Sequence, residues 1–188
     1  MILRHLGRIA LLVICGFTGH YLLSQYHLES ETKVKLDAEE PLFTADNIKS
    51  TRYNEHGMRS YTLNSIHVKH YQKLDETHFH KPTLWTYNDS TVEEWRIHSD
   101  FAVLDSSNYL NMTGHVRIFN LLPNARMAII KVDKLTLNLT TRDFWSETET
   151  EITGVGFQIR GQRAKGNFIS HQMELTDQVK SKYAPDIE

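Results

Sequence analysis

The feature that most constrains the fold of this chain is a period-two alternation of apolar and polar residues, which recurs after Pro41. Leucines occupy every second position from Leu135 to Leu139, with threonine and asparagine between them. A similar alternation marks 116–118 and 169–176. Successive side chains of a strand point to opposite faces, so this pattern predicts half-buried antiparallel strands.

Turn-forming residues separate the apolar runs at a spacing typical of short strands. Turns are expected at 53–57, 87–90, 105–108 and 122–124. In the first of them, Gly57 supplies the positive φ that a tight turn requires. No twelve-residue window in this region shows the 3.6-residue period of an amphipathic helix, and even 175–183 is expected to be a strand. The region is therefore predicted to be all-β.

A weak internal repetition points to a stack of similar strand–turn–strand units. The sequence Met-Thr-Gly-His-Val at 112–116 resembles Ile-Thr-Gly-Val at 152–155. Such repetition without helices predicts an elongated sandwich or jellyroll. Gly154 and Gly156 lie in a strand-like context with no helix after them, so a β-bulge is favoured over a phosphate-binding loop.

Residues 1–28 are predicted to form a transmembrane anchor, because Ile9–Leu23 carries no formal charge. If Arg8 snorkels toward the headgroups, the segment approaches the lower limit of about 17 residues that spans a bilayer. Two arginines precede the run and acids follow it, which predicts a cytoplasmic N-terminus. The alternative is a cleaved signal peptide, although no small-residue cleavage site follows the run. Residues 29–40 are expected to be a linker and 41–188 the folded domain.

The composition excludes several functional classes. With 21 Lys+Arg against 23 Asp+Glu, the chain lacks the basic excess of a dedicated nucleic-acid binder. A single cysteine, Cys15, excludes an internal disulfide framework and a cysteine-based zinc site. The sequence holds no motif of a hydrolase, a zinc protease or a nucleotide-binding loop, so neither an enzyme nor a cofactor is predicted. Glycosylation sequons begin at Asn88, Asn111 and Asn138 and matter only in a eukaryotic secretory protein.

Histidines and aromatic residues each leave two interpretations open. His78 and His80 would share a strand face near His67 and His70, a spacing that can bind Zn²⁺ or Cu²⁺. No carboxylate or cysteine completes an obvious ligand set, so exposed histidines without a metal are favoured. The aromatic residues Phe79, Trp85, Tyr87 and Trp95 are typical of an ordinary β core, or of an apolar groove able to hold acyl chains.

Three short stretches resemble the LptC family, the bitopic inner-membrane component of the lipopolysaccharide transport bridge of Gram-negative bacteria. The first is Tyr53-Asn-Glu-His-Gly57, followed by Ser60-Tyr61 and His67-Val68. The second is Gly114-His115-Val116, followed by Leu122-Pro123. The third runs from Gly161 to Gly166-Asn167, followed by Glu174-Leu175, Val179 and Tyr183. Their order and spacing, together with the predicted anchor, make the resemblance specific.

The resemblance implies an open antiparallel β-jellyroll, shaped as a V-shaped trough, in the periplasm after one transmembrane helix. It implies a non-enzymatic adaptor that receives lipopolysaccharide from the inner-membrane transporter. In this family the N-terminal edge meets LptF, which acts with LptG and the LptB ATPase, and the C-terminal edge meets the bridge protein LptA. The alternatives are a structural tether that does not handle lipid, and an unrelated lectin-like sandwich on a membrane stalk.

The resemblance also assigns roles to individual residues. Family trough positions that would contact lipid fall on Ile48, Phe79, Met173 and Tyr183. Gly154 falls on a strand glycine of the family and is assigned to backbone geometry needed for assembly. The docking edge for LptA is expected on an alternating strand that includes Ile169, Met173 and Leu175, because few residues follow it and a terminal strand leaves hydrogen-bonding groups unpaired.

Overall fold

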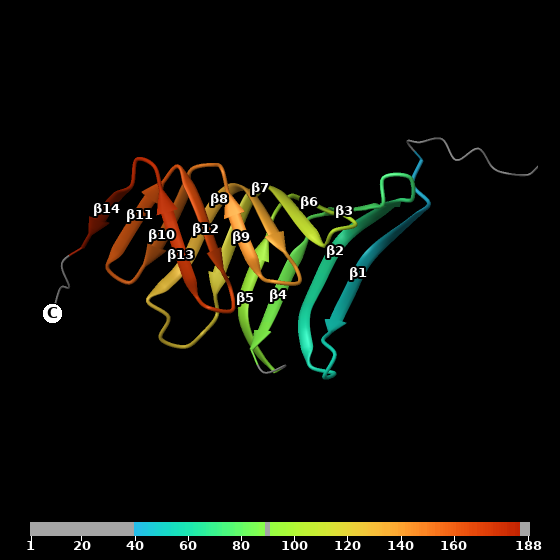
Figure 1. Ribbon diagram of the computed structural model, residues 1–188, viewed down its shortest axis with the longest axis horizontal. Coiled ribbons are helices and arrows are strands. Elements are labelled where there is room, and N and C mark those ends of the chain that lie inside the picture. Colours follow the sequence, from blue (N-terminus) through green and yellow to red (C-terminus); the bar gives the residue numbers. More distant parts are fainter. Residues whose placement is uncertain (1–39, 89–90, 185–188) are drawn as a thin grey trace, which may run out of the picture. The chain divides into compact units, whose positions relative to one another are not determined.

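Figure 1 shows a computed structural model of the chain, which describes residues 40–88 and 91–184. The described residues form one antiparallel sheet of fourteen strands. In chain order the strands are β1 (Phe43–Tyr53), β2 (Arg59–Tyr71), β3 (Glu76–His80), β4 (Thr83–Asn88), β5 (Val92–His98), β6 (Phe101–Leu104), β7 (Tyr109–Asn120), β8 (Met127–Asn138), β9 (Asp143–Ser146), β10 (Thr150–Gly154), β11 (Phe157–Gly161), β12 (Arg163–Asn167), β13 (Gln172–Thr176) and β14 (Lys180–Tyr183).

The long strands divide the sheet into two walls. One half of β2 pairs with β4 and the other with β3, and β7 pairs likewise with β5 and with β6. Strand β8 pairs with β10 and with β9. We call β4, β5, β10, β11 and β14 the β5 wall, and β3, β6, β9, β12 and β13 the β9 wall. The long strands contribute one half to each wall.

Left-handed backbone conformations occur where the long strands pass from one wall to the other. In β7 the register with β8 shifts between Thr113 and Val116, across Gly114 at φ +77° and His115 at φ +47°. In β1, Asn47 has φ +53° and interrupts the pairing with β2. Such residues bend a strand because they interrupt its regular pleat. These residues therefore bend β1 and β7 where they pass from one wall to the other.

The hydrophobic core lies between the walls. Leu63, Leu84, Ile97 and Ile118 come from the β5 wall, and Phe79, Ala102, Leu110, Met112, Leu137 and Phe144 from the β9 wall. The predicted alternation is confirmed, because Leu135, Leu137 and Leu139 are buried while Thr136 and Asn138 are less so. Burial of each such side chain contributes about 1.5–3 kcal/mol. The apolar face of each strand therefore turns inward.

Two sequence-based predictions need correction. Ile169 does not belong to the strand that holds Met173 and Leu175, because β13 begins at Gln172 and residue 169 lies in the preceding turn. The two similar segments, 112–116 and 152–155, are not equivalent either. Gly114 lies at a bend within β7, whereas Gly154 ends β10 beside a hairpin. Beside Gly154 the register against β8 shifts between Thr153 and Gly154, but the extra residue is Ala128 of β8, while Gly154 itself keeps a regular pairing with Phe157 of β11.

The predicted anchor (1–28) and nearly all of the linker (29–40) lie outside the described residues, so they stay predictions. Within residues 40–88 and 91–184, no helix is both long and apolar enough to cross a membrane.

Candidate functional site

The space between the walls is the first candidate site. Its lining is apolar along the described domain, from partly buried Ile48 and Tyr61 near one end to Phe157, Met173 and Leu175 near the other. Figure 1 places β1 and β14 at opposite ends of this arrangement. The fully buried middle therefore continues into partly exposed apolar residues on both sides.

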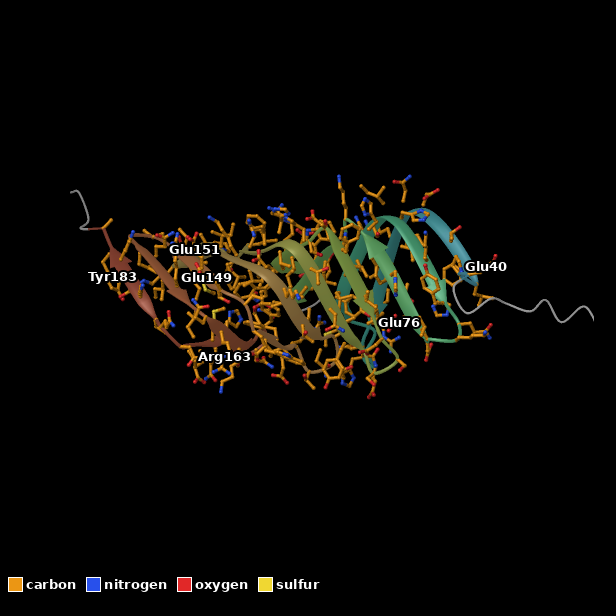
Figure 2. The ribbon with its side chains drawn as sticks, turned by 90° about the horizontal axis from the view of Figure 1, so that it is seen from above. Glu40, Glu76, Glu149, Glu151, Arg163 and Tyr183 are labelled. Carbon is orange, nitrogen blue, oxygen red and sulfur yellow. The ribbon has the colours of Figure 1, made fainter. Side chains whose placement is uncertain are left out.

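The residues predicted to contact lipid are spread along this space. Ile48 on β1 and Met173 on β13 are partly buried and pack against the core. Phe79 on β3 is a core residue, 8% exposed, opposite Val68 and Ala102. Tyr183 differs from them, because it is 72% exposed. It lies at the end of β14, where Figure 2 labels it. The four residues do not form one pocket.

The middle of the interior is tightly packed. Trp95 donates its indole N–H to the carbonyl of Phe168 at 3.3 Å, and Phe168 stacks on Phe144 with ring centres 4.4 Å apart. The cavity bounded by these residues and Met173 has a volume of only about 10 Å³. Because a methylene chain needs several times that space, this central cavity holds no acyl chain in this conformation.

Two larger hollows are also present, and the first of them shares Phe144, His171 and Met173 with the small cavity. One, of about 1260 Å³, is lined by residues of β9, β12 and β13, including Trp145, Lys165 and Met173. The other, of about 380 Å³, lies between the β1–β2 turn and residues of the β9 wall, with Glu55 on one side and Thr140 on the other. Both are open, with polar side chains among their lining.

The ends of the sheet are the second candidate site. Among the described residues, β1 pairs with β2 alone, β13 with β12 alone and β14 with β11 alone. A strand paired on one side presents free N–H and C=O groups on the other. Exposed apolar side chains accompany these edges: Phe43 and Tyr53 on β1, and Val179 and Tyr183 near β14. Of the predicted docking residues, Met173 and Leu175 lie on β13, and Ile169 is 68% exposed in the turn before it.

Gly154 is held in a space that admits no side chain. A Cβ atom there would lie 2.2 Å from the carbonyl oxygen of Arg126 and 2.3 Å from the ring of Phe157. The same Arg126 carbonyl accepts the N–H of Val155 at 2.9 Å. The glycine therefore positions the β10–β11 hairpin, and β11 in turn carries the terminal strand β14.

Three polar residues at the rim between the walls were missed by sequence analysis. Arg142, in the β8–β9 turn, donates from Nη2 to the carbonyl and the hydroxyl oxygen of Ser60, both at 2.7 Å. The Nε2 atom of His171, in the β12–β13 turn, lies 2.6 Å from a carboxylate oxygen of Glu94 on β5. Both Arg142 and Glu94 are 7% exposed. Burial lowers the pKa of the Arg142 guanidinium, and Tyr61 and Glu94 oppose that shift.

Comparison with known proteins identifies the family. A family model described as lipopolysaccharide-assembly, LptC-related, matches residues 9–184. The chain belongs to the LptC family. The lipopolysaccharide export system protein LptC of Escherichia coli K12 is 27% identical over 175 residues, covering 93% of this chain and 88% of that protein. The protein of the same name from Haemophilus influenzae is 24% identical over 192 residues, covering 93% and 91%.

A solved structure is also similar. It is LptH of Pseudomonas aeruginosa, described as "the LptA homologous periplasmic component of the conserved lipopolysaccharide transport device". It aligns with a TM-score of 0.47 and 7% identity, covering 79% of this chain and 99% of that one.

Membership of the LptC family makes the chain a component of the lipopolysaccharide export system, located in the cell envelope. Members of this family are non-enzymatic components of a transport system, in agreement with the prediction that the chain is not an enzyme.

The histidine pair of this LptC member makes local contacts. The Nε2 atom of His78 lies 2.8 Å from a carboxylate oxygen of Glu76, and the ring of His80 packs on Phe101. His67 lies directly across the strand pair from His80, with its Nδ1 atom 2.5 Å from a carboxylate oxygen of Asp46. Within the described ranges no group of three or more histidine, cysteine or acidic side chains is placed to hold a metal ion.

The sequence left undecided whether the four aromatic residues form a core or a groove, and the structure places them on two different faces of the sheet. Phe79 and Trp95 are buried in the core, whereas Trp85 and Tyr87 are less buried and alternate with buried Leu84 and Thr86 on β4. The hydroxyl of Tyr87 donates to Thr62 at 3.2 Å. The four residues therefore do not form one groove.

Ion pairs on the outer surface reinforce the strand pairing near the C-terminal end. Glu151, labelled in Figure 2, accepts from Lys131 on β8 and from Arg160 on β11 at 2.9 and 2.8 Å. The hydrogen bond from Lys131 lowers the pKa of Glu151 below its ordinary value of 4.5, with Arg160 adding to that effect and burial opposing it. The Glu151 carboxylate therefore stays charged at neutral pH, and it links its own strand β10 to β8 and β11 in the β5 wall.

Proposed function

We propose that this chain receives lipopolysaccharide from an inner-membrane ABC transporter formed by LptF, LptG and the LptB ATPase, and passes it to the periplasmic bridge protein LptA. In this proposal the domain is an open jellyroll trough in the periplasm, held by one N-terminal transmembrane helix whose start is cytoplasmic. The observation that carries the proposal is an apolar interior that runs between two sheet edges with free hydrogen-bonding groups.

The apolar interior suits a ligand with acyl chains, because each buried CH₂ group contributes about 0.8 kcal/mol. Free strand edges suit transfer between domains, because a partner strand can extend the sheet by main-chain hydrogen bonds. Strand β1 is the proposed edge toward LptF, and β13 and β14 are the proposed edges toward LptA. The interior would then continue from one domain into the next.

The second candidate is a structural tether that joins transporter and bridge without handling lipid. The packing around Trp95, Phe144 and Phe168 favours it, because the cavity there is only about 10 Å³. The two candidates differ in whether acyl chains ever reach the core side of the walls.

Photocrosslinking separates these candidates. A benzoyl-phenylalanine in place of Met173, which packs against the core, is expected to capture lipopolysaccharide in cells that contain the whole export system. The matched control is the same probe in place of Lys134, which is exposed on β8 next to buried Leu135 and so lies on the opposite face of that strand. Capture confined to Met173 supports the adaptor. Equal capture at both positions, or none, would leave the tether as the function.

A proline on β14 tests the proposed LptA edge. The N–H of Ala184 donates to the carbonyl of Gly156 at 2.9 Å, so by strand alternation the N–H groups of Ser181 and Tyr183 face away from β11. Ser181→Pro is expected to abolish capture of LptA while the domain stays folded, because the lost N–H has no partner within the sheet. The measurement is a pull-down of LptA and LptF by the full-length protein in detergent.

The control for this edge is Ser181→Ala, which retains the N–H group and should retain both partners. If Ser181→Pro still captures LptA, the bridge docks on β13 or elsewhere. A point change is preferable to deletion of 168–188, since the deletion also removes Phe168, which is 2% exposed in the core.

A further inference from the structure

Along one side of the domain, polar contacts connect the β5 wall to the β9 wall. The packing of the apolar core does not require these contacts. We use the name rim contacts for the bonds of Arg142 to Ser60 and its position over Tyr61, together with the pair His171–Glu94. Each contact joins a turn of the β9 wall to a strand of the β5 wall. Because both turns reach across, the rim contacts hold the walls together along one side.

The fold positions Arg142 by its backbone. Its φ of +67° lies in the left-handed region, which is unusual for a residue with a side chain. Its N–H donates to the carbonyl of Asn138 at 2.9 Å, and its own carbonyl accepts the N–H of Phe168 at 3.1 Å. The β8–β9 turn is thus hydrogen-bonded to the segment that leads to His171, so the two turns are coupled.

Glu94 reaches the rim because of a β-bulge. The register between β4 and β5 shifts between Thr86 and Tyr87, which pair with Trp95 and Glu93, so Glu94 is the extra residue. An extra residue breaks the alternation of faces, and here it leaves two successive residues, Glu94 and Trp95, both buried. Its carbonyl accepts the N–H of Leu121 at 2.9 Å, which fixes the bulge against the end of β7.

The rim contacts are poorly suited to a purely stabilising role. The Nη1 atom of Arg142 is buried and has no hydrogen-bond partner among the described residues. Burying a charge carries a desolvation cost that often cancels the gain from its partners, and apolar residues of similar volume often stabilise as well or better. On opening, however, Arg142, Glu94 and His171 regain water, so the cost of parting the rim is lower than for an apolar contact of the same size.

We infer that the rim contacts are a closure that must break before an acyl chain can enter between the walls. The inference rests on the proposed function, because it concerns access of lipid to the same interior. It accounts for the tightly packed middle of the interior, since parting of the walls at Arg142 and His171 would enlarge the cavity of about 10 Å³ beside Trp95, Phe144 and Phe168. Arg142 and Glu94 are then positioning residues for lipid entry.

The first test measures the distance across the rim in the full-length protein in detergent. Nitroxide labels are placed at Glu55→Cys and Thr140→Cys, which line opposite sides of the 380 Å³ hollow, after Cys15→Ser removes the native thiol. Arg142→Met keeps a long side chain over Tyr61 and removes the bonds to Ser60. The expected result is a label–label distance distribution that shifts to longer values. An unchanged distribution would overturn the inference.

The second test uses the Met173 photocrosslinking probe in the same variant. Arg142→Met is expected to raise capture of lipopolysaccharide several-fold, because the walls part more often. Longer label distances with unchanged or lower capture would also overturn the inference, because opening would then not admit lipid. If the unsubstituted protein captures no lipopolysaccharide, the proposed function fails, and the label distances still decide whether Arg142 holds the rim closed.

A second variant guards against misfolding. His171→Ala removes the partner of Glu94. Because the side chain of His171 is 40% exposed, this substitution perturbs the core less than a change at Arg142. It is expected to lengthen the label distance and to raise capture in the same direction. If Arg142→Met shows no cooperative thermal transition, the result for His171→Ala decides. The control is His78→Ala, whose side chain is also 40% exposed and whose partner Glu76 lies on the same strand β3, so it should change neither reading.

Discussion

Trp95→Ala is expected to lower the free energy of unfolding by about 3–5 kcal/mol, the range for removal of a buried aromatic side chain. Trp95 is 2% exposed on β5 and donates its indole N–H to Phe168 in the opposite wall. The centre of its ring also lies 5.1 Å from the ring centre of Phe168 and 5.9 Å from the ring centre of His171. Truncation therefore leaves a cavity and removes a contact between the walls. Urea unfolding of the full-length protein in detergent measures the change.

Two control variants separate the causes of this loss. Trp95→Phe keeps a ring and loses the indole hydrogen bond, so it should cost less than alanine. Trp145→Ala removes the same side chain type from a position that is 36% exposed on β9, and a smaller loss is expected there. If Trp95→Ala and Trp145→Ala destabilise the protein equally, then the packing between the walls contributes far less than its burial indicates.

Gly154→Val is expected to destabilise the C-terminal end of the sheet and to abolish capture of LptA. With a Cβ position 2.2 Å from the Arg126 carbonyl, the β10–β11 hairpin must move away from β8. Overpacking of this kind costs about 1–3 kcal/mol, and movement of β11 displaces β14, the proposed docking edge. The urea midpoint reports the destabilisation, and the pull-down of LptA and LptF reports the effect on docking.

The matched control is Val155→Ala, one residue further along. Val155 is 74% exposed, so its truncation should change stability by less than about 0.5 kcal/mol and leave both partners bound. Retention of LptA by a Gly154→Val protein with a lowered urea midpoint would show that the hairpin stabilises the fold without positioning the docking edge. An unchanged midpoint would show that the hairpin adjusts to the side chain at little cost.

Local patterns predicted much of this fold. The alternation at Leu135, Leu137 and Leu139 appears as a buried row on β8 and the residue after it, and the turns at 53–57 and 105–108 lie where their residues predicted. These features are local: strand geometry places neighbouring side chains on opposite faces, and Gly57, at φ +72°, adopts the turn conformation without a steric cost. The two glycines at 154 and 156 indicated an irregular stretch, and the register against β8 does shift there, although the extra residue lies on β8 and Gly156, at φ +74°, belongs to the β10–β11 turn.

Other predictions failed or remained out of reach because they depend on where a strand begins and which strand it pairs with. Ile169 continued the alternation of Met173 and Leu175 in the sequence, yet the β12–β13 turn includes it, and its N–H donates to the side chain of Asn167 at 2.8 Å. That hydrogen bond closes the turn and delays the start of β13. Apolar alternation alone contains no information about such a side-chain bond.

The sequence by itself therefore determined the strand faces, most of the turns and the resemblance to the LptC family. Tertiary structure alone decided which residues meet across the two walls. By alternation Glu94 and Trp95 should face opposite ways, but the bulge against β4 leaves both of them buried. Nothing in the sequence distinguishes Arg142 from an ordinary turn residue, yet its side chain donates a hydrogen bond to Ser60, 82 positions away in the chain. Period-two patterning is a property of one strand, whereas bulges and wall-to-wall contacts arise from the pairing of distant strands.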